Sequence, residues 1–337
     1  MSSYSEAKTI YEKLQDEKSR NIFLNRLNWS ISKDDYYLFA ETDSKVTDLL
    51  HKINLDTPVV IYGINHNAET LFNVFNRYIN ITCFCDEIFD GNKYHRDLPV
   101  ISVDELIAKY KECIILLSDN IRLKSVYNLI KNGFKKEQII TFVKNGTEYF
   151  DLPCFVPNEN EIFVDAGGYT GDTVIKFLTW CNYKYKKIYA IEPDENNCKT
   201  LMANIKKESF DNIHIYQQGV WNKKDVLKFE DTGNVDSKIA PDGKSSIKVD
   251  TIDNIVANDK VTFIKLDVEG AELEALQGAS RTIEQHKPRI AVCIYHKPED
   301  FIEIPLFFIN NFPDYKLYIR KYSYNWDYYD VILYAII

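Results

Sequence analysis

A glycine-rich turn, Asp165-Ala166-Gly167-Gly168-Tyr169-Thr170-Gly171, constrains the fold of this chain more than any other segment. The apolar run 162–164 precedes it, and a helical pattern over 173–180 follows it. A strand, a glycine-rich turn and a helix in this order are typical of the start of a parallel α/β sheet. The glycines let the backbone approach a ligand closely, and the helix behind them offers free N–H groups.

Further strand and helix patterns alternate after this turn. They cover 188–191, 195–206, 213–217, 263–266, 271–285 and 289–294. Two short strands, 226–229 and 246–249, indicate an antiparallel excursion within the series. Strands at 315–319 and 330–336 are expected to pair antiparallel at its end. We therefore predict one Rossmann-like α/β domain over residues 146–337.

A smaller alternating series occupies residues 56–145. Its predicted strands are Val59–Tyr62, Ile81–Cys85, Ile114–Leu117 and Ile139–Phe142, with helical patterns between them. This alternation predicts a second parallel, Rossmann-like sheet. Before it, Ile10, Leu14 and Leu27 follow a helical spacing that no glycine or proline interrupts. We expect an α-helical lead-in over residues 1–55.

The first turn of the smaller series, Gly63-Ile64-Asn65-His66-Asn67, has only one of the glycines expected in a dinucleotide-binding turn. Side chains at Asn65 and Asn67 restrict the close approach of a pyrophosphate. We interpret this unit as a degenerate module for dimerisation, substrate presentation or scaffolding. Asp86, after the second strand, keeps nucleotide binding open as the alternative.

The charge of the chain argues against one class of partner. The net charge is −9 and the pI is near 5.3, whereas sequence-independent binders of nucleic acid normally carry a basic excess. We therefore expect no nucleic-acid partner. No apolar run reaches the ~18–20 residues that span a bilayer, and the polar segment 1–16 lacks the apolar stretch of a secretory signal. The prediction is a cytoplasmic protein without a membrane span.

The spacing of the cysteines and histidines predicts no metal centre. The seven cysteines are scattered, and Cys83-Phe84-Cys85 has no second ligand pair behind it, so buried free thiols are expected. The six histidines show no HExxH-like spacing. Asp267 and the acidic residues near it nevertheless leave a metal ion open.

Two carboxylates, Asp165 and Glu192, lie at the ends of the first two predicted strands of the larger series. Asp165 would repel a pyrophosphate but would attract the ammonium group of an amino acid. Glu192 can accept hydrogen bonds from both hydroxyls of a ribose, as in other nucleoside-binding α/β folds. A nucleoside with a cationic tail fits both groups, and S-adenosylmethionine is such a ligand. The alternative is that both carboxylates only cap helices.

The segment Ile264–Glu272 adds a third element to this predicted site. Asp267 ends a strand and is expected at the same crevice as the glycine-rich turn. The small residues Gly270 and Ala271 would let the following helix pack tightly. Glu269 and Glu272 either take part in the site or interact with the dipole of that helix.

These motifs together resemble one enzyme family. The series VDAGGYTGDT, IEPD and FIKLDVEGAELEALQGA is similar to the FkbM family of methyltransferases, and the resemblance covers residues 155–337. The segment Cys293–Asp300, with Ile304-Pro305 behind it, resembles a subgroup in which YHKxED follows the fifth strand. Arg320-Lys321-Tyr322-Ser323 departs from the Arg-His-Tyr-Ser run of that subgroup, so no role of that histidine is carried over to this chain.

The resemblance implies a class I methyltransferase fold with S-adenosylmethionine as the methyl donor. It also implies O-methylation of a hydroxyl group on a sugar, a glycan or a related natural product. The turn would surround the methionine part of the cofactor through Asp165, Gly167, Gly168, Tyr169 and Gly171. Around the rest of the cofactor, Glu192 would hold the ribose, Gln218 and Gly219 would border the adenine, and Asp267 would stand near the methyl group.

A hydroxyl group loses a proton as it attacks the methyl group, so a base near neutral pKa helps. His296 is the first candidate because it follows the fifth strand, and Asp267 is the second. His296 is alternatively a structural residue. Two other functions stay open: an NAD-dependent oxidoreductase or epimerase that uses the smaller unit, and a non-catalytic nucleotide-binding protein. A small-molecule or glycan acceptor is the expected partner, and a homodimer is left open.

Overall fold

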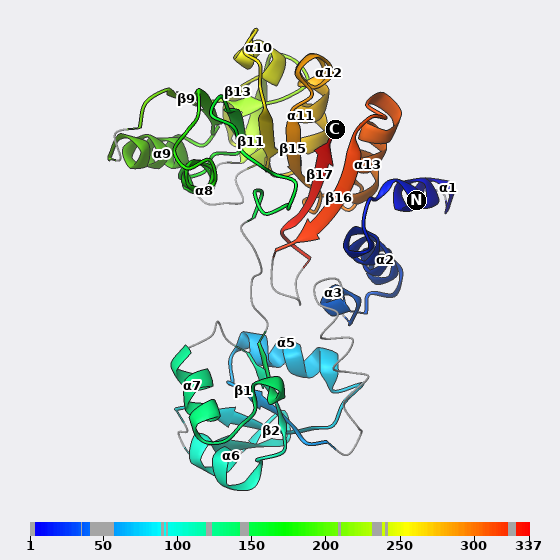
Figure 1. Ribbon diagram of the computed structural model, residues 1–337, viewed down its shortest axis with the longest axis vertical. Coiled ribbons are helices and arrows are strands. Elements are labelled where there is room, and N and C mark those ends of the chain that lie inside the picture. Colours follow the sequence, from blue (N-terminus) through cyan, green and yellow to red (C-terminus); the bar gives the residue numbers. More distant parts are fainter. Residues whose placement is uncertain are drawn as a thin grey trace. The chain divides into compact units, whose positions relative to one another are not determined.

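The computed structural model of the protein describes residues 4–34, 36–40, 57–88, 91, 94–118, 123–141, 148–207, 210–230, 238–239, 242–322 and 328–337. The chain divides into two compact units (Figure 1). The larger unit comprises Met1–Arg20, Gly146–Lys321 and Tyr329–Ile337, and the smaller unit comprises Asn21–Asn145 and Tyr322–Tyr328.

The smaller unit contains a six-stranded sheet in the order β3-β4-β2-β1-β5-β6. In that order the strands are Tyr94–His95, Leu98–Ser102, Ile81–Asp86, Val59–Tyr62, Ile114–Leu117 and Ile139–Thr141. All neighbours pair parallel except β3 and β4, which form an antiparallel pair. The predicted parallel sheet is therefore present.

Alternation along β2 separates two hydrophobic clusters in the smaller unit. Phe84 packs in one cluster, while Cys83 and Cys85 pack in the other. The helices beside the sheet are α5 (His66–Phe75), α6 (Val103–Lys109) and α7 (Leu123–Lys131), and α3 (Tyr36–Ala40) belongs to the same unit. Ser102 caps α6 by accepting a hydrogen bond from the Glu105 N–H.

The larger unit contains a seven-stranded sheet in the order β16-β17-β15-β14-β7-β8-β9. In that order the strands are Lys316–Lys321, Val331–Ile336, Arg289–Cys293, Phe263–Leu266, Ile162–Ala166, Lys187–Ile191 and Ile213–Tyr216. The five strands from β15 to β9 are parallel, and β17 is antiparallel to both of its neighbours. The terminal antiparallel pair predicted from the sequence is thereby confirmed.

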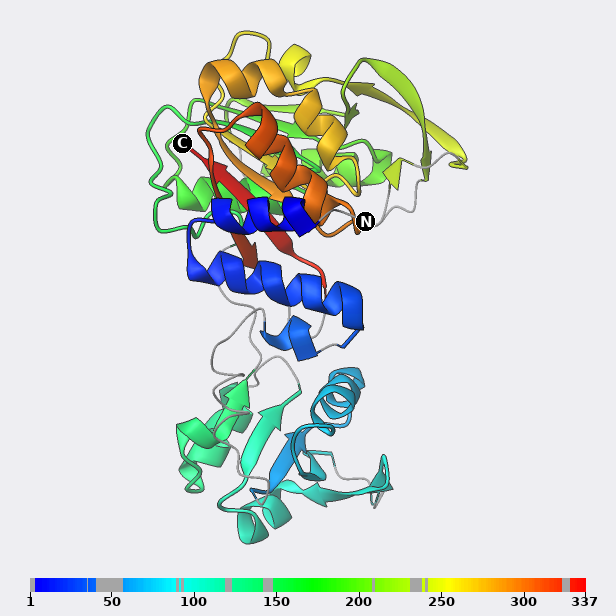
Figure 2. The ribbon, with the colours of Figure 1, turned by 90° about the vertical axis from the view of Figure 1, so that its right-hand side faces the viewer.

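The order of the strands creates one switch point in this sheet. The chain moves from β7 to β8 and β9 in one direction, and later from β14 to β15 in the other. Because such crossovers are right-handed, the helices of the two halves cover opposite faces. The first half contributes α8 (Asp172–Trp180) and α9 (Glu195–Lys207); the second contributes α11 (Glu272–Gln277), α12 (Ser280–His286) and α13 (Asp300–Asn311), drawn in orange in Figure 2. Ligands of such sheets bind beyond the carboxyl ends of the strands at the switch point, here between β7 and β14.

A small second sheet branches from the larger unit. Its order is β10-β13-β11-β12, with bounds Gly219–Val220, Ser245–Asp250, Asp225–Glu230 and Lys238–Ile239. Strands β11 and β13 pair antiparallel, as the pattern over 226–229 and 246–249 predicted.

The single helix predicted over 271–285 is wrong, because the structure breaks it into α11 and α12. A Cβ on Gly278 would lie 2.1 Å from the carbonyl oxygen of Trp221, so the backbone packs closely there. Asp253, in α10 (Ile252–Val256), accepts hydrogen bonds from the N–H groups of Arg281 and Thr282. This long-range cap starts the second helix, and no local pattern reveals it.

The first residues of the helical lead-in belong to the larger unit. Helix α1 (Tyr4–Lys13) lies beside α13, and Leu14 forms a bridge with Leu317 of β16. Asp16 then pairs with Arg320 at 2.6 Å, just before α2 (Glu17–Ser32). Division into domains at 1–55, 56–145 and 146–337 remains a proposal, and residues 41–56 lie outside the described residues.

All seven cysteines are free, as predicted, and only Cys154 is exposed. Among the described residues, no helix is long and apolar enough to cross a membrane.

Candidate cofactor and catalytic site

The glycine-rich turn after β7 folds back onto both neighbouring strands. The N–H groups of Gly167 and Gly168 donate to the Ile191 carbonyl at 3.0 and 2.9 Å. Gly167 has φ +82°, and a Cβ there would lie 1.8 Å from the backbone oxygen of Asp267. Gly171, at φ +89°, is the N-cap residue of α8. Only glycine fits Gly167, because both the backbone conformation and the approach of Asp267 exclude a side chain.

Glu192, at the end of β8, binds the backbone of this turn. Its carboxylate accepts hydrogen bonds from the N–H groups of Tyr169 and Asp194, both at 2.9 Å. The side chain is almost fully buried. Burial raises the pKa of Glu192 to about 7, although the two backbone hydrogen bonds act in the opposite direction. The predicted carboxylate therefore lies against the glycine-rich turn.

Asp165 is completely buried within β7, beside β14. Neither oxygen of its carboxylate has a hydrogen-bond partner among the described residues. Its Oδ1 lies 3.3 Å from the ammonium group of Lys265, the residue opposite it in register. Burial raises the pKa of Asp165 to about 6, and the charge of Lys265 limits that rise. The carboxylate is thus held below the turn rather than at the start of a helix.

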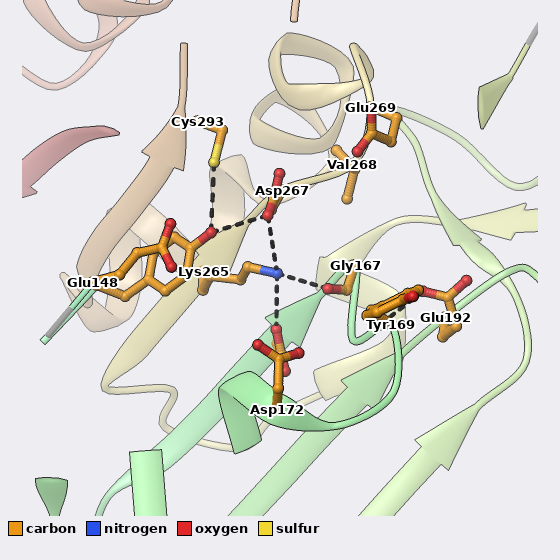
Figure 3. A network of polar contacts seen from close by, with 12 residues as sticks. Glu148, Gly167, Tyr169, Asp172, Glu192, Lys265, Asp267, Val268, Glu269 and Cys293 are labelled. Atoms are coloured by element: carbon orange, nitrogen blue, oxygen red, sulfur yellow. Dashed lines mark hydrogen bonds and ion pairs between the residues drawn. The ribbon is translucent and has the colours of Figure 1, made fainter. Parts of the chain in front are cut away.

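Lys265 is a buried lysine at the centre of the site that was not predicted from the sequence. Its Nζ donates to the Gly167 carbonyl at 2.6 Å and lies 3.7 Å from Oδ2 of Asp267 (Figure 3). Burial lowers the pKa of its ammonium group, but Asp165 and Asp267 together raise the pKa above the ordinary value. A lysine inside the apolar strand Phe263–Leu266 was the signal that could have marked it.

Asp267 follows β14 and presents its two carboxylate oxygens to different groups. Oδ2 accepts a hydrogen bond from the Tyr149 hydroxyl at 2.9 Å. Oδ1 is buried without a hydrogen-bond partner among the described residues and lies 3.5 Å from Nε2 of His296. Burial raises the pKa of Asp267, but Lys265 and His296 outweigh it, so the pKa is lowered and the carboxylate is ionised.

Tyr149 is a second site residue that sequence reasoning missed. It precedes the first strand of the larger sheet, and its N–H donates to the Tyr334 hydroxyl at 3.1 Å. Its side chain is buried, and burial together with Asp267 raises the pKa of its hydroxyl. The hydroxyl therefore stays protonated and donates to Asp267. No motif near Tyr149 in the sequence signals this contact.

His296, just after β15, is surrounded by carboxylates. Nδ1 lies 2.8 Å from Oε1 of Glu272, and Nε2 lies 3.5 Å from both Oδ1 of Asp267 and Oε2 of Glu269. Burial lowers the pKa of the ring, but Glu269, Glu272 and Asp267 outweigh it and raise the pKa to about 11. In that protonated form the imidazole has no lone pair for a further proton. Of the two predicted bases, Asp267 is then the one able to accept a proton.

The residues predicted to border the adenine follow β9, the strand next to β8. Gln218 is half-buried between β9 and β10, and its N–H donates to the Tyr216 carbonyl at 3.0 Å. Gly219 is buried in β10, where a Cβ would meet the side chain of Val249 at 3.0 Å. Packing alone explains this glycine, so its cofactor contact stays a prediction.

The carboxyl ends of four adjacent strands therefore gather the other predicted site residues. Strands β7, β8, β14 and β15 carry Asp165 with the glycine-rich turn, Glu192, Asp267 and His296 in that order. Buried charged side chains of both signs lie around the glycine-rich turn, which has no side chains at Gly167 and Gly168. This arrangement can bind a polar ligand with a ribose beside the turn and place it near Asp267.

Comparison with known proteins agrees with this architecture. The model of the methyltransferase FkbM domain matches residues 165–325. The crystal structure of methyltransferase FkbM from Methylobacillus flagellatus KT has 19% identity and a TM-score of 0.53, over 95% of this chain and 99% of that chain. No curated protein matches the sequence.

Other solved structures match only part of the chain. An rRNA methylase from Streptococcus thermophilus has 14% identity and a TM-score of 0.36, over 53% of this chain and 87% of that chain. A putative methyltransferase from Streptococcus mutans, in complex with SAH, has 12% identity and a TM-score of 0.36, over 54% of this chain and 92% of that chain.

The similarity to the Methylobacillus structure extends along almost the whole chain and supports the α/β fold of both units. The family match begins at Asp165 and includes the glycine-rich turn, Glu192, Asp267 and His296. Residues 165–325 therefore match the methyltransferase FkbM domain, and this match identifies the chain as a methyltransferase.

Proposed function

We propose that the protein transfers a methyl group from S-adenosylmethionine to a hydroxyl group of a sugar, a glycan or a related natural product. One observation carries the cofactor part of the proposal. Glu192 is a buried carboxylate that reaches from the end of β8 to the backbone of the glycine-rich turn after β7. A nucleoside that lies over this turn would present its ribose hydroxyls to Glu192.

The cofactor is proposed to extend from Glu192 along the turn toward Asp267. Two backbone N–H groups bind the Glu192 carboxylate, which leaves lone pairs for the two ribose hydroxyls. The methionine part would lie against Gly167, Gly168, Tyr169 and Gly171, with its ammonium group attracted by Asp165. Gln218 and Gly219 are retained as proposed neighbours of the adenine.

The transfer itself is an in-line displacement. The acceptor oxygen forms a bond to the methyl carbon, the bond between that carbon and sulfur breaks, and S-adenosylhomocysteine leaves. The hydroxyl proton passes to Asp267, which is ionised and has one oxygen without a hydrogen-bond partner among the described residues. Alignment of the two reactants contributes about 7–11 kcal/mol to lowering the barrier when the geometry is good.

The cationic His296 has a different proposed role from the predicted one. Its positive charge, held by Glu272 and Glu269, lies next to Asp267 and keeps that carboxylate ionised. An ionised Asp267 accepts a hydrogen bond from the acceptor hydroxyl before the transfer. His296 thereby supports Asp267 rather than removing the proton directly.

The smaller unit offers less support for a nucleotide. Asn65 uses its side-chain oxygen to accept the Ala68 N–H at 2.9 Å, which occupies the start of α5. A phosphate would need such N–H groups to be free. The proposal therefore assigns the cofactor to the larger unit alone.

Calorimetry separates these assignments. We expect one molecule of S-adenosylhomocysteine to bind per chain, and we expect no heat from NAD. Radiolabelled S-adenosylmethionine with a panel of sugars, glycans and hydroxylated natural products then identifies the acceptor. Binding of NAD without binding of S-adenosylhomocysteine would overturn the proposal.

A further inference from the structure

Three side chains of the types that bind metal ions converge beyond the glycine-rich turn. Asp267, Glu272 and His296 each offer one ligand atom, and these atoms lie within 4.8 Å of one another. They come from the loop after β14, the first residue of α11 and the loop after β15. The sequence spacing did not predict this cluster, because the fold brings together residues from two separate strand ends.

Two carboxylate oxygens in this cluster are buried without a hydrogen-bond partner among the described residues. One is Oδ1 of Asp267, and the other is Oε2 of Glu272. The Glu272 side chain has no exposed surface at all. A buried carboxylate oxygen without a hydrogen-bond partner costs free energy, so such atoms point to a ligand that would satisfy them.

The remaining atoms of the cluster are held in place by the protein. Oε1 of Glu272 accepts the Val268 N–H at 2.8 Å and lies 2.8 Å from Nδ1 of His296. On the other side, Tyr149 and Lys265 engage Oδ2 of Asp267 and leave its Oδ1 facing His296. Ligands fixed in this way lose little conformational freedom when an ion binds.

We propose that Asp267, Glu272 and His296 bind one divalent metal ion of the Mn²⁺ or Mg²⁺ type at the acceptor side of the site. Two carboxylates favour these oxygen-seeking ions, and one imidazole favours Mn²⁺ over Mg²⁺. Glu269, whose Oε2 lies 3.5 Å from Nε2 of His296, adds a further negative charge at the rim. Glu269 is thus a third carboxylate beside the cluster of Asp267, Glu272 and His296.

Binding of the ion does not depend on the proposed function, but the role of the ion in methyl transfer rests on it. An ion at this position would bind a hydroxyl oxygen of the acceptor and stabilise the negative charge that develops there during methyl transfer. A pair of neighbouring hydroxyls, as sugars carry, would bind it through both oxygens. The ion would thereby favour a diol acceptor over a simple alcohol. Only a neutral imidazole has a lone pair for a metal, so binding of the ion would release the proton of His296. The ion would then supply the positive charge beside Asp267 that the proposed function assigns to His296.

Titration of Mn²⁺ into the full-length protein tests the proposal. The protein is first stripped with EDTA and dialysed, and bound Mn²⁺ is followed by calorimetry and by the loss of the free-ion EPR signal. We expect one Mn²⁺ per chain in the wild type and at least about tenfold weaker binding in Asp267→Asn and Glu272→Gln, because each variant removes one charged ligand. Glu284→Gln, which alters an exposed carboxylate on α12, is the matched control and should bind like the wild type.

Two results would overturn the metal site: no Mn²⁺ binding to the wild type, or equal binding by the wild type and both ligand variants. Circular dichroism identifies a variant that fails to fold, and the other ligand variant then decides the outcome. Binding of S-adenosylhomocysteine to the stripped protein separates this proposal from the proposed function. If S-adenosylhomocysteine binds and Mn²⁺ does not, only the metal site is wrong; if Mn²⁺ binds and S-adenosylhomocysteine does not, the proposed function is wrong.

Discussion

The two α/β units differ most in the turn after their first strand. In the smaller unit, Gly63 is followed by Asn65, whose side chain caps the next helix. In the larger unit, Gly167 and Gly168 have no side chain, and the backbone N–H of Tyr169 is bound by Glu192 from the neighbouring strand. The turn of the smaller unit is hydrogen-bonded by its own residue Asn65, whereas the turn of the larger unit is hydrogen-bonded by the buried carboxylate of Glu192. We propose on this basis that the larger unit binds the cofactor and that the smaller unit does not.

The acidic residue after the second strand shows the same contrast. Asp86, at the end of β2, accepts the N–H of Ile88, two residues further along the chain. Glu192 accepts the N–H of Asp194 in the same way, and it also reaches a turn that lies 23 residues earlier in the chain. Both carboxylates thus accept a local N–H, and only Glu192 also contacts the first turn of its unit.

The largest expected effect comes from Gly167→Ala. A methyl group there would lie 1.8 Å from the Asp267 backbone oxygen at a φ of +82°. Strain and overpacking together should cost about 3 kcal/mol or more of unfolding free energy, measured by urea unfolding, and binding of S-adenosylhomocysteine should be lost. Gly171→Ala is the control, because its φ is +89° but its nearest neighbour lies at 3.6 Å. It should cost about 1 kcal/mol; equal losses in both variants would show that the contact with Asp267 is unimportant.

Glu192→Gln should weaken binding of S-adenosylhomocysteine by about 10- to 100-fold. The expected size follows from the 1.5–3 kcal/mol typical of hydrogen bonds to a charged group, where about 1.4 kcal/mol is tenfold. Asp86→Asn makes the equivalent change in the smaller unit and should leave the affinity unchanged. Calorimetry on both variants checks this difference. An effect of Asp86→Asn as large as that of Glu192→Gln would remove the contrast between the units.

The pH dependence of binding should follow Glu192. Burial raises the pKa of this carboxyl from 4.5 to about 7, with Asp194 adding to the rise and Lys265 opposing it. The ionised form accepts both ribose hydroxyls, so affinity for S-adenosylhomocysteine should increase from pH 6 to pH 8. Stability of the free protein should change in the opposite sense: the contribution of this group is present below pH 4.5 and is lost as the pH rises through about 7.

Calorimetry at several pH values tests this behaviour. Glu192→Gln is the control, because it carries no titrating group at this position and should show a flatter profile. If the wild type and the variant show the same pH profile, Glu192 does not control the affinity.

The smallest expected effect concerns Asn65→Ala in the smaller unit. Loss of the cap of α5 should lower the unfolding free energy by about 1 kcal/mol, measured by urea unfolding. Binding of S-adenosylhomocysteine should stay at the wild-type level, since the cofactor is assigned to the other unit. A rise in NAD affinity in this variant would instead indicate that the capped turn is a blocked nucleotide site.

The sequence predicted the architecture well where local pattern and structure coincide. Apolar runs identified the strands of both sheets, and the strand-end rule placed Asp165, Glu192 and Asp267 at one edge of the larger sheet. Contacts between distant segments were not predictable in this way. The break between α11 and α12 depends on Asp253, and the position of Tyr149 depends on Asp267 and Tyr334.

The protonation states of the site residues could not be predicted from the sequence either. His296 was predicted as a base because an imidazole normally titrates near neutral pH, but three carboxylates raise its pKa to about 11. Such a shift is a sum over neighbours that the fold assembles from separate loops. Lys265 is an intermediate case: its presence in an apolar strand was visible, but its contacts with Asp165 and Asp267 were not.

Hydrogen–deuterium exchange with and without S-adenosylhomocysteine tests the contrast between the two units most directly. We predict slower exchange on binding at the glycine-rich turn 165–172 and around Glu192. The turn over 63–68 of the smaller unit should exchange at the same rate with and without the ligand. Protection of 63–68 with no change at 165–172 would contradict the assignment of the cofactor to the larger unit.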